Sequence, residues 1–138
     1  MSTSTDFPST HRFPPPSSAA ALLGQARACV RAADRAVTPA DRFTTAYLAA
    51  LRAAGAVLAL RGRPVRGRAE PTSAWALLPG LAPELREWAW YFASCSPARA
   101  ALRMGAVRRV DPRSADDLVR QAGQFTELVD GIVREGGS

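Results

Sequence analysis

Apolar residues recur along residues 41–61 at a spacing that predicts one long, buried helix. Five of them fall three or four residues apart, as on one helix face: Phe43, Tyr47, Leu51, Ala54 and Leu58. A second apolar row covers much of the remaining surface: Leu48, Ala50, Val57 and Leu60. A helix that is apolar on most sides needs neighbours on most sides, so we expect the other helices to pack around this one.

The ends of this helix are marked by residues that favour helix termini. Thr38 is a typical N-cap, Pro39 suits the first helical position, and Gly62 fits a left-handed C-cap. Arg52 divides the segment into two apolar runs, 44–51 and 53–60, of eight residues each. Because a spanning helix needs about 20 consecutive apolar residues, we expect a core helix and no membrane insertion.

Further segments carry helical patterns with recognisable starts and stops. The predicted elements are a helix at 18–37, a short turn at 75–78 stopped by Pro79-Gly80, a helix opened by Pro83, a separate helix that begins at Ser96-Pro97, and a last helix capped by Ser114. No stretch alternates long enough to form a strand. The sequence therefore predicts an all-α fold, a four- to five-helix bundle over residues 18–135, preceded by a disordered Ser/Thr/Pro-rich tail at 1–17.

The charge of the chain is strongly basic. Its 18 basic residues are all arginine, the net charge is +6, and the pI is near 10.9. A basic domain is a candidate for binding nucleic acid or another anionic surface. The alternative is a genome of high GC content, which favours Ala and Arg codons and gives a basic but inert surface.

Two regions concentrate arginines. Arg27, Arg31 and Arg35 form a stripe on the first helix, which is either a phosphate-binding ridge or a solvated face. The loop 61–68 carries further arginines between glycines and a proline, and its candidate anion-binding residues are Arg63, Arg66 and Arg68. The last helix is acidic, so it is expected to lie beside the basic first helix.

Residues for catalysis or metal binding are scarce. His11 is the single histidine and lies in the tail, which excludes a Ser–His–Asp triad or a Cys–His pair within the folded domain. Cys29 and Cys95 are separated and are expected to be reduced core residues, with no zinc site. No glycine-rich phosphate loop follows a strand. We therefore expect no cofactor, no metal and a cytoplasmic location.

Three segments resemble the HEPN superfamily (higher eukaryotes and prokaryotes nucleotide-binding domains): residues 43–54, 84–95 and 94–103. The chain looks in particular like a small family of uncharacterised actinobacterial HEPN-like proteins. Active HEPN ribonucleases carry an Arg and a following His with four to six residues between them. Arg99 or Arg103 could occupy the arginine position, but the residues at the histidine offsets are Met104, Gly105 and Ala106 or Arg108, Arg109 and Val110. The resemblance thus implies a binding role without cleavage, and a homodimer.

Three functions follow as hypotheses. The first is a non-catalytic HEPN-like module that binds RNA, a nucleotide or a protein partner. Its anion contacts would come from Arg99 and Arg103, expected near the helix start at Ser96-Pro97, with the loop arginines adding further contacts. The second is a protein-interaction or scaffold domain with incidental charge, and the third is a divergent ribonuclease. Opposed charges on the first and last helices give a second reason to expect a homodimer.

Overall fold

The computed structural model describes residues 18–62, 71–106 and 110–136, without the side chains of 71–73. Within these ranges the chain forms five α-helices, one 3₁₀ turn and no strand, which confirms the all-α prediction. The elements are α2 (Ala19–Arg35), α3 (Pro39–Arg61), α4 (Pro71–Leu81), the 3₁₀ turn η1 (Pro83–Leu85), α5 (Arg86–Arg103) and α6 (Pro112–Gly136). The predicted tail at 1–17 lies outside the described residues.

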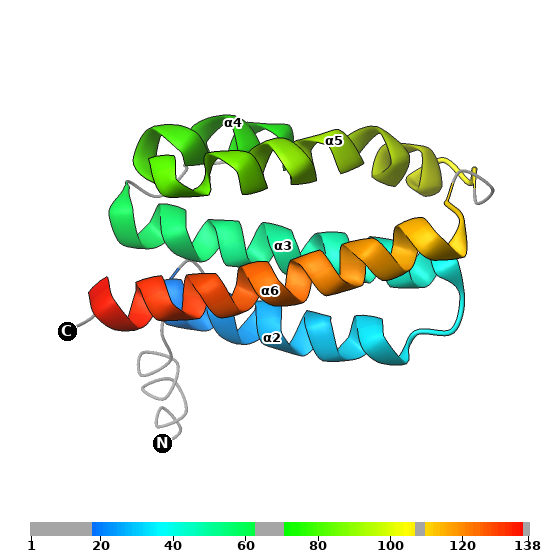
Figure 1. The fold of residues 1–138 in the computed structure, drawn as a ribbon, viewed down its shortest axis with the longest axis horizontal. Helices are drawn as coiled ribbons and strands as arrows, with labels where there is room; N and C mark the ends of the chain where they lie inside the picture. Colours follow the sequence, from blue (N-terminus) through cyan, green and yellow to red (C-terminus); the bar gives the residue numbers. More distant parts are fainter. Residues whose placement is uncertain (1–17, 63–70, 107–109, 137–138) are drawn as a thin grey trace, which may run out of the picture.

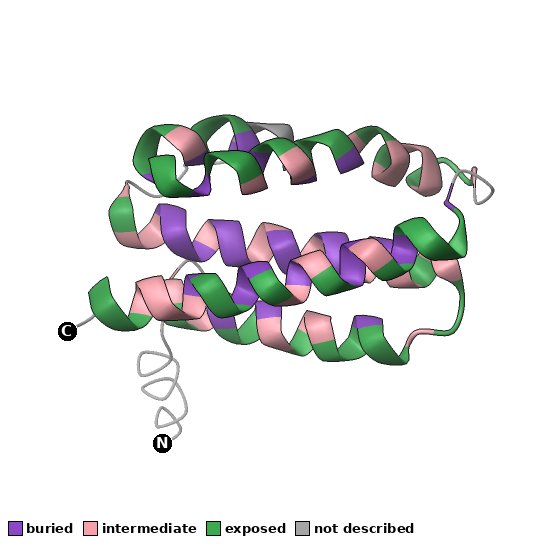
Figure 2. Ribbon diagram, viewed as in Figure 1, coloured by how far each residue is buried: buried purple, intermediate pink, exposed green. Residues whose placement is uncertain are grey.

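The helix α3 is the centre of the bundle, as its apolar pattern predicts. It runs between α4 and α5 on one side and α2 and α6 on the other (Figure 1). It contacts each of these four helices, and α2 and α5 lie on opposite sides of it. The buried positions in Figure 2 accordingly run along α3 over several turns.

Alanines, more than the predicted leucines, bring the neighbours close to α3. Ten of its 23 residues are buried, and six of these are alanine. Leu58 is buried as expected, but Leu51 is only half-buried. Leu51 nevertheless packs against the buried core. Small side chains such as Ala49 and Ala53 are fully buried, and their size lets neighbouring helices pack closely against α3.

Side-chain caps fix three helix starts. Ser18 Oγ accepts from Ala21 N at 3.1 Å. Thr38 Oγ1 accepts from Asp41 N at 3.1 Å, which confirms the predicted Thr38 cap. At α6 the cap was misplaced, because Asp111 Oδ1 accepts from Ser114 N at 2.7 Å and the helix begins at Pro112. This backbone hydrogen bond lowers the pKa of Asp111.

Two predicted helix boundaries are absent. The Ser96-Pro97 pair does not begin a new helix, since α5 is continuous from Arg86 to Arg103 with Pro97 inside it. Pro97 lacks an N–H for the helical ladder, but Phe92 before it and Leu102 after it pack on the same core and hold the helix together. Likewise α4 continues through Pro79 to Leu81.

Two predicted helix ends also differ. Gly62 is extended, with φ −133°, so it is not the expected left-handed cap. The first helix stops at Arg35 and does not reach the predicted end at Val37, which is 89 % exposed.

The acidic last helix lies beside the basic first helix, as expected. Arg27 Nη1 is 3.3 Å from Glu127 Oε2, and Arg27 Nη2 is 3.0 Å from Asp130 Oδ2. These bridges join α2 and α6 within one chain. The opposed charges are therefore satisfied without a second copy, and they no longer support a homodimer.

The predicted membrane argument for α3 needs correction as well. By length and composition alone this helix could cross a membrane, so Arg52 does not exclude a span as the sequence argument assumed. Burial distinguishes a core helix from a membrane span, because 56 % of the most apolar 18-residue stretch of α3 is buried inside the bundle. A helix enclosed by four others is typical of a protein core.

Candidate functional site

The predicted site residue Arg99 stacks on an aromatic ring in the interior. Its guanidinium carbon lies 5.2 Å from the centroid of the Tyr47 ring, which is within cation–π range. The side chain is half-buried, and its Nε atom is buried without a hydrogen-bond partner. Stacking thus holds the guanidinium in place, although one of its donors remains unused.

A buried polar cluster supports the ring beneath Arg99. Tyr47 is fully buried, and its hydroxyl accepts a hydrogen bond from Trp75 Nε1 at 2.9 Å. The same hydroxyl lies 2.7 Å from Ser96 Oγ, in a hydrogen bond for which either group can be the donor. Residues of α3, α4 and α5 therefore meet at one hydroxyl, which fixes the position of the Tyr47 ring.

Sequence reasoning missed this cluster, although the sequence contained a partial signal for a buried hydrogen bond. A tyrosine or tryptophan in an apolar stripe needs a partner for its polar atom. Which partner it finds depends on how the helices pack. Ser96 was interpreted as a helix cap, while in the structure its hydroxyl bonds Tyr47 across the bundle.

The second predicted site residue, Arg103, lies one turn beyond Arg99 on the same helix. It is exposed and belongs to the last turn of α5. The expected proximity of this pair to a helix N-terminus is therefore wrong, because the helix does not restart at Pro97. The dipole at a helix C-terminus favours cations, so it stabilises Arg103 and does not attract an anion.

The remaining predicted site residues, Arg63, Arg66 and Arg68, lie outside the described residues. Their segment nevertheless matters for the charge balance. The described ranges contain 12 of the 18 arginines and 10 of the 12 acids, and so carry +2 of the net +6. Most of the basic excess therefore belongs to the segments that are not described, which include 63–70 and 107–109.

Ion pairs neutralise many of the described arginines. Arg61 Nη2 lies 2.8 Å from Glu84 Oε2, and this contact lowers the pKa of Glu84. The other arginines with an acidic partner are Arg27, Arg42, Arg120 and Arg134. No ion pair of Arg99 or Arg103 occurs within the part of the chain that the structure describes. In the basic stripe of α2, Arg27 is paired, whereas Arg31 and Arg35 are exposed.

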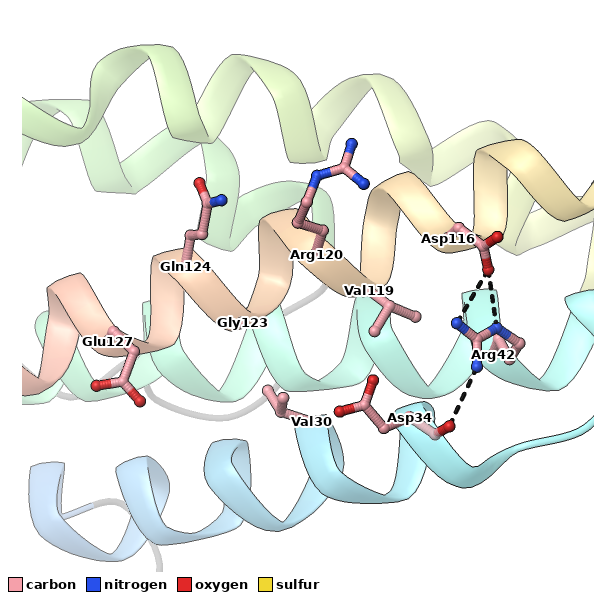
Figure 3. Close-up of a pocket in the computed structure, with 9 residues that line it drawn as sticks. All are labelled: Val30, Asp34, Arg42, Asp116, Val119, Arg120, Gly123, Gln124 and Glu127. Carbon is pink, nitrogen blue, oxygen red and sulfur yellow. Dashed lines mark hydrogen bonds and ion pairs between the residues drawn. The ribbon is translucent and has the colours of Figure 1, made fainter.

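A groove of about 460 Å³ runs along α2 and α6, with Val30, Val119 and Gly123 among its lining residues (Figure 3). Arg42 closes one end. Its Nη2 lies 2.9 Å from Asp116 Oδ1, and its Nη1 donates to the carbonyl oxygens of Ala33 and Asp34, each at 3.2 Å. Arg42 thus caps the C-terminus of α2 and ties it to α6. The charge of Arg42 is used in these structural contacts and is not available to an anion. We therefore describe the groove as the seam between α2 and α6 and not as an anion site.

A smaller hollow of about 200 Å³ continues the same seam and reaches Thr126. Thr126 is 2 % exposed, and its hydroxyl oxygen has no hydrogen-bond partner. An unpartnered buried hydroxyl is destabilising, but this oxygen lies below the surface that water reaches. We assign it no binding role.

The described residues offer few groups for thiol or metal chemistry. Burial raises the pKa of both thiols, Cys29 and Cys95, which favours their protonated form. Burial also raises the pKa of Tyr91 to about 12. Among the described residues, no three His, Cys, Asp or Glu side chains lie close enough to hold a metal ion.

Comparison with known families agrees with this fold. Neither the curated proteins nor the solved structures give a significant match to the chain. A family model described as SAV_6107-like HEPN matches residues 33–130, which run from the end of α2 into α6 and include the whole of α3 and α5. Because this match spans well over half of the chain, the protein belongs to the SAV_6107-like HEPN family.

Proposed function

We propose that this HEPN-like bundle is a non-catalytic module that binds the phosphates of RNA or of a nucleotide through Arg99 and Arg103. One observation carries the proposal: the two arginines lie one turn apart on α5, and neither has an acidic partner within the described ranges. Arginine presents a planar fork of donors that suits phosphate.

The position of Arg99 adds to this support. Its guanidinium is held over Tyr47, and Tyr47 is itself held by Trp75 and Ser96, so the charge is placed before a ligand arrives. A positioned side chain loses less conformational entropy on binding. The basic excess outside the described ranges, which includes Arg63, Arg66 and Arg68, would supply further phosphate contacts.

Binding without cleavage is proposed because the residues for cleavage are not in place. The positions separated from Arg99 by four to six residues are Met104, Gly105 and Ala106, none of which can transfer a proton. The single histidine, His11, lies outside the described residues. A divergent ribonuclease would show time-dependent cleavage of the RNA used for binding, whereas we expect that RNA to remain intact.

A second candidate, a protein-interaction domain, is favoured by a different feature of α5. Trp90 on this helix is 62 % exposed, and Met104, directly after its last residue, is 85 % exposed. Large apolar side chains on a surface often mark a protein contact. A protein partner and an anionic ligand would use neighbouring parts of the same helix.

The proposal is tested by fluorescence anisotropy with labelled single-stranded RNA at low salt, with an unlabelled mononucleotide as competitor. The double substitution Arg99→Ala with Arg103→Ala should weaken binding to many sequences alike. Because Arg99→Ala also uncovers the Tyr47 ring, Arg103→Ala alone is measured beside it, and circular dichroism verifies the fold of each variant.

The matched control is Arg31→Ala with Arg35→Ala on α2. This pair has the same four-residue spacing, is exposed, and ends in the last turn of its helix, as Arg103 does. The control removes the same charge, so it should retain most of the binding if the α5 pair is the site. Absence of wild-type binding, or equal losses in the two double variants, would refute the assignment.

A further inference from the structure

The hydrogen bond between the Tyr47 and Ser96 hydroxyl groups has a direction that chemistry fixes. The two oxygens are 2.7 Å apart, and the Tyr47 oxygen also accepts from the Nε1–H of Trp75, which can only donate. Tyr47 is 0 % exposed, so its own proton cannot reach water. A buried donor without an acceptor is costly, and among the described residues Ser96 Oγ is the acceptor within reach. Tyr47 therefore donates to Ser96.

This direction leaves the proton of the Ser96 hydroxyl to be donated elsewhere. Ser94 on the same helix donates to the carbonyl oxygen of Tyr91, one turn back, as serines in helices often do. The Ser96 hydroxyl makes no such bond within the ranges that the structure describes, and its residue is half-buried. Its proton is therefore available to water or to a ligand.

Ser96 lies on the same side of α5 as the two arginines of the proposed site. The positions 96, 99 and 103 are separated by three and four residues, which places them along one helix face. Both Ser96 and Arg99 contact Tyr47, the first at its hydroxyl and the second over its ring. One buried side chain thus sets the positions of a neutral donor and of a charged group beside it.

The burial of Arg99 Nε leaves a bound phosphate with oxygens for a further donor. This atom is buried and unpartnered, so a ligand at the surface can meet only the terminal Nη groups of Arg99. A phosphate held by these groups keeps oxygens that can accept another hydrogen bond. A hydroxyl one turn away on the same helix face is placed to supply that bond.

We propose that the Ser96 hydroxyl is a third binding group of this site and donates to an oxygen of the phosphate that Arg99 binds; this inference rests on the proposed function. The chain of donors runs from Trp75 through Tyr47 to Ser96, and each bond polarises the next. Ser96 is therefore a stronger donor than an isolated serine. It carries no charge, so it adds affinity without displacing a counterion.

The test measures binding of labelled single-stranded RNA to the full chain by fluorescence anisotropy at several salt concentrations. Ser96→Ala should weaken binding about tenfold, which corresponds to about 1.4 kcal/mol, with an unchanged slope of log K against log salt concentration. Arg103→Ala, by contrast, should make that slope shallower by about 0.7. Ser96→Thr keeps a hydroxyl and should restore most of the affinity. Ser94→Ala removes a hydroxyl that bonds its own helix, so this matched control should bind as the wild type does.

The salt slope separates a lost contact from a structural effect of Ser96→Ala. Because Ser96 is half-buried, water can replace its hydroxyl as the acceptor of the Tyr47 proton. A disturbed Tyr47 would instead displace Arg99, lower the charge at the site and make the slope shallower. Unchanged binding by Ser96→Ala, or a shallower slope, would overturn this inference alone if Arg103→Ala behaves as expected. No binding by the wild type, or an unchanged slope in Arg103→Ala, would overturn the proposed function with it.

Discussion

Removal of the Tyr47 hydroxyl is expected to destabilise the bundle through one buried hydrogen bond. Tyr47→Phe keeps the ring under Arg99 but leaves the Trp75 N–H without its acceptor, and Trp75 is only 3 % exposed. An unsatisfied buried donor costs roughly 1–3 kcal/mol. Ser96 is half-buried and can turn toward water, so it adds little to that loss.

Urea unfolding followed by circular dichroism measures this effect. With a slope of about 2 kcal/mol per molar, a loss of about 2 kcal/mol lowers the midpoint by about 1 M at constant slope. Ser96→Ala is the comparison, because it leaves the Trp75 bond intact and should cost less than about 1 kcal/mol. An unchanged midpoint for Tyr47→Phe, or a larger loss for Ser96→Ala, would refute the description of this cluster.

Three further outcomes test the core and the seam between α2 and α6. Leu58→Asp should abolish cooperative unfolding, because Leu58 is buried, whereas Leu51→Asp should leave a folded but less stable protein, because Leu51 is half-buried. Equal melting temperatures for the two variants would contradict this difference. Thr126→Val should be neutral or stabilise by up to about 1 kcal/mol in urea unfolding, since the hydroxyl has no partner; a clear loss would reveal an unseen bond. The hydrogen bond from Arg27 lowers the pKa of Asp130, so this bond stabilises the folded state fully above the ordinary carboxyl pKa of 3.8. The stabilisation is lost as the pH falls through the lowered pKa of Asp130. Urea midpoints of Asp130→Asn should therefore fall less than those of the wild type between pH 5 and pH 2, and parallel curves would exclude this role.

The sequence predicted features that depend on neighbouring residues and missed those that depend on packing. The Thr38 cap and the central place of α3 follow from local signals, and both are confirmed. Ser96-Pro97 carries the same local signal as Thr38-Pro39, yet it lies inside a helix because the core on both sides of Pro97 stabilises continuity. A local rule cannot distinguish these two cases.

The candidate site shows the same division. The spacing of Arg99 and Arg103 on one helix face was readable from the sequence. Their distance from the start of the helix could not be predicted, because it depended on whether α5 was interrupted at Pro97. The contact between Arg99 and Tyr47 joins residues 52 positions apart, and only the packing of α5 on α3 brings them together.

The salt dependence of RNA binding tests the central claim most directly. For single-stranded nucleic acid each phosphate contact contributes about 0.7 to the slope of log K against log salt concentration. The account predicts that the slope becomes shallower by about 1.4 in Arg99→Ala with Arg103→Ala, and remains close to that of the wild type in Arg31→Ala with Arg35→Ala. An unchanged slope in the α5 variant, or no binding by the wild type at low salt, would contradict it.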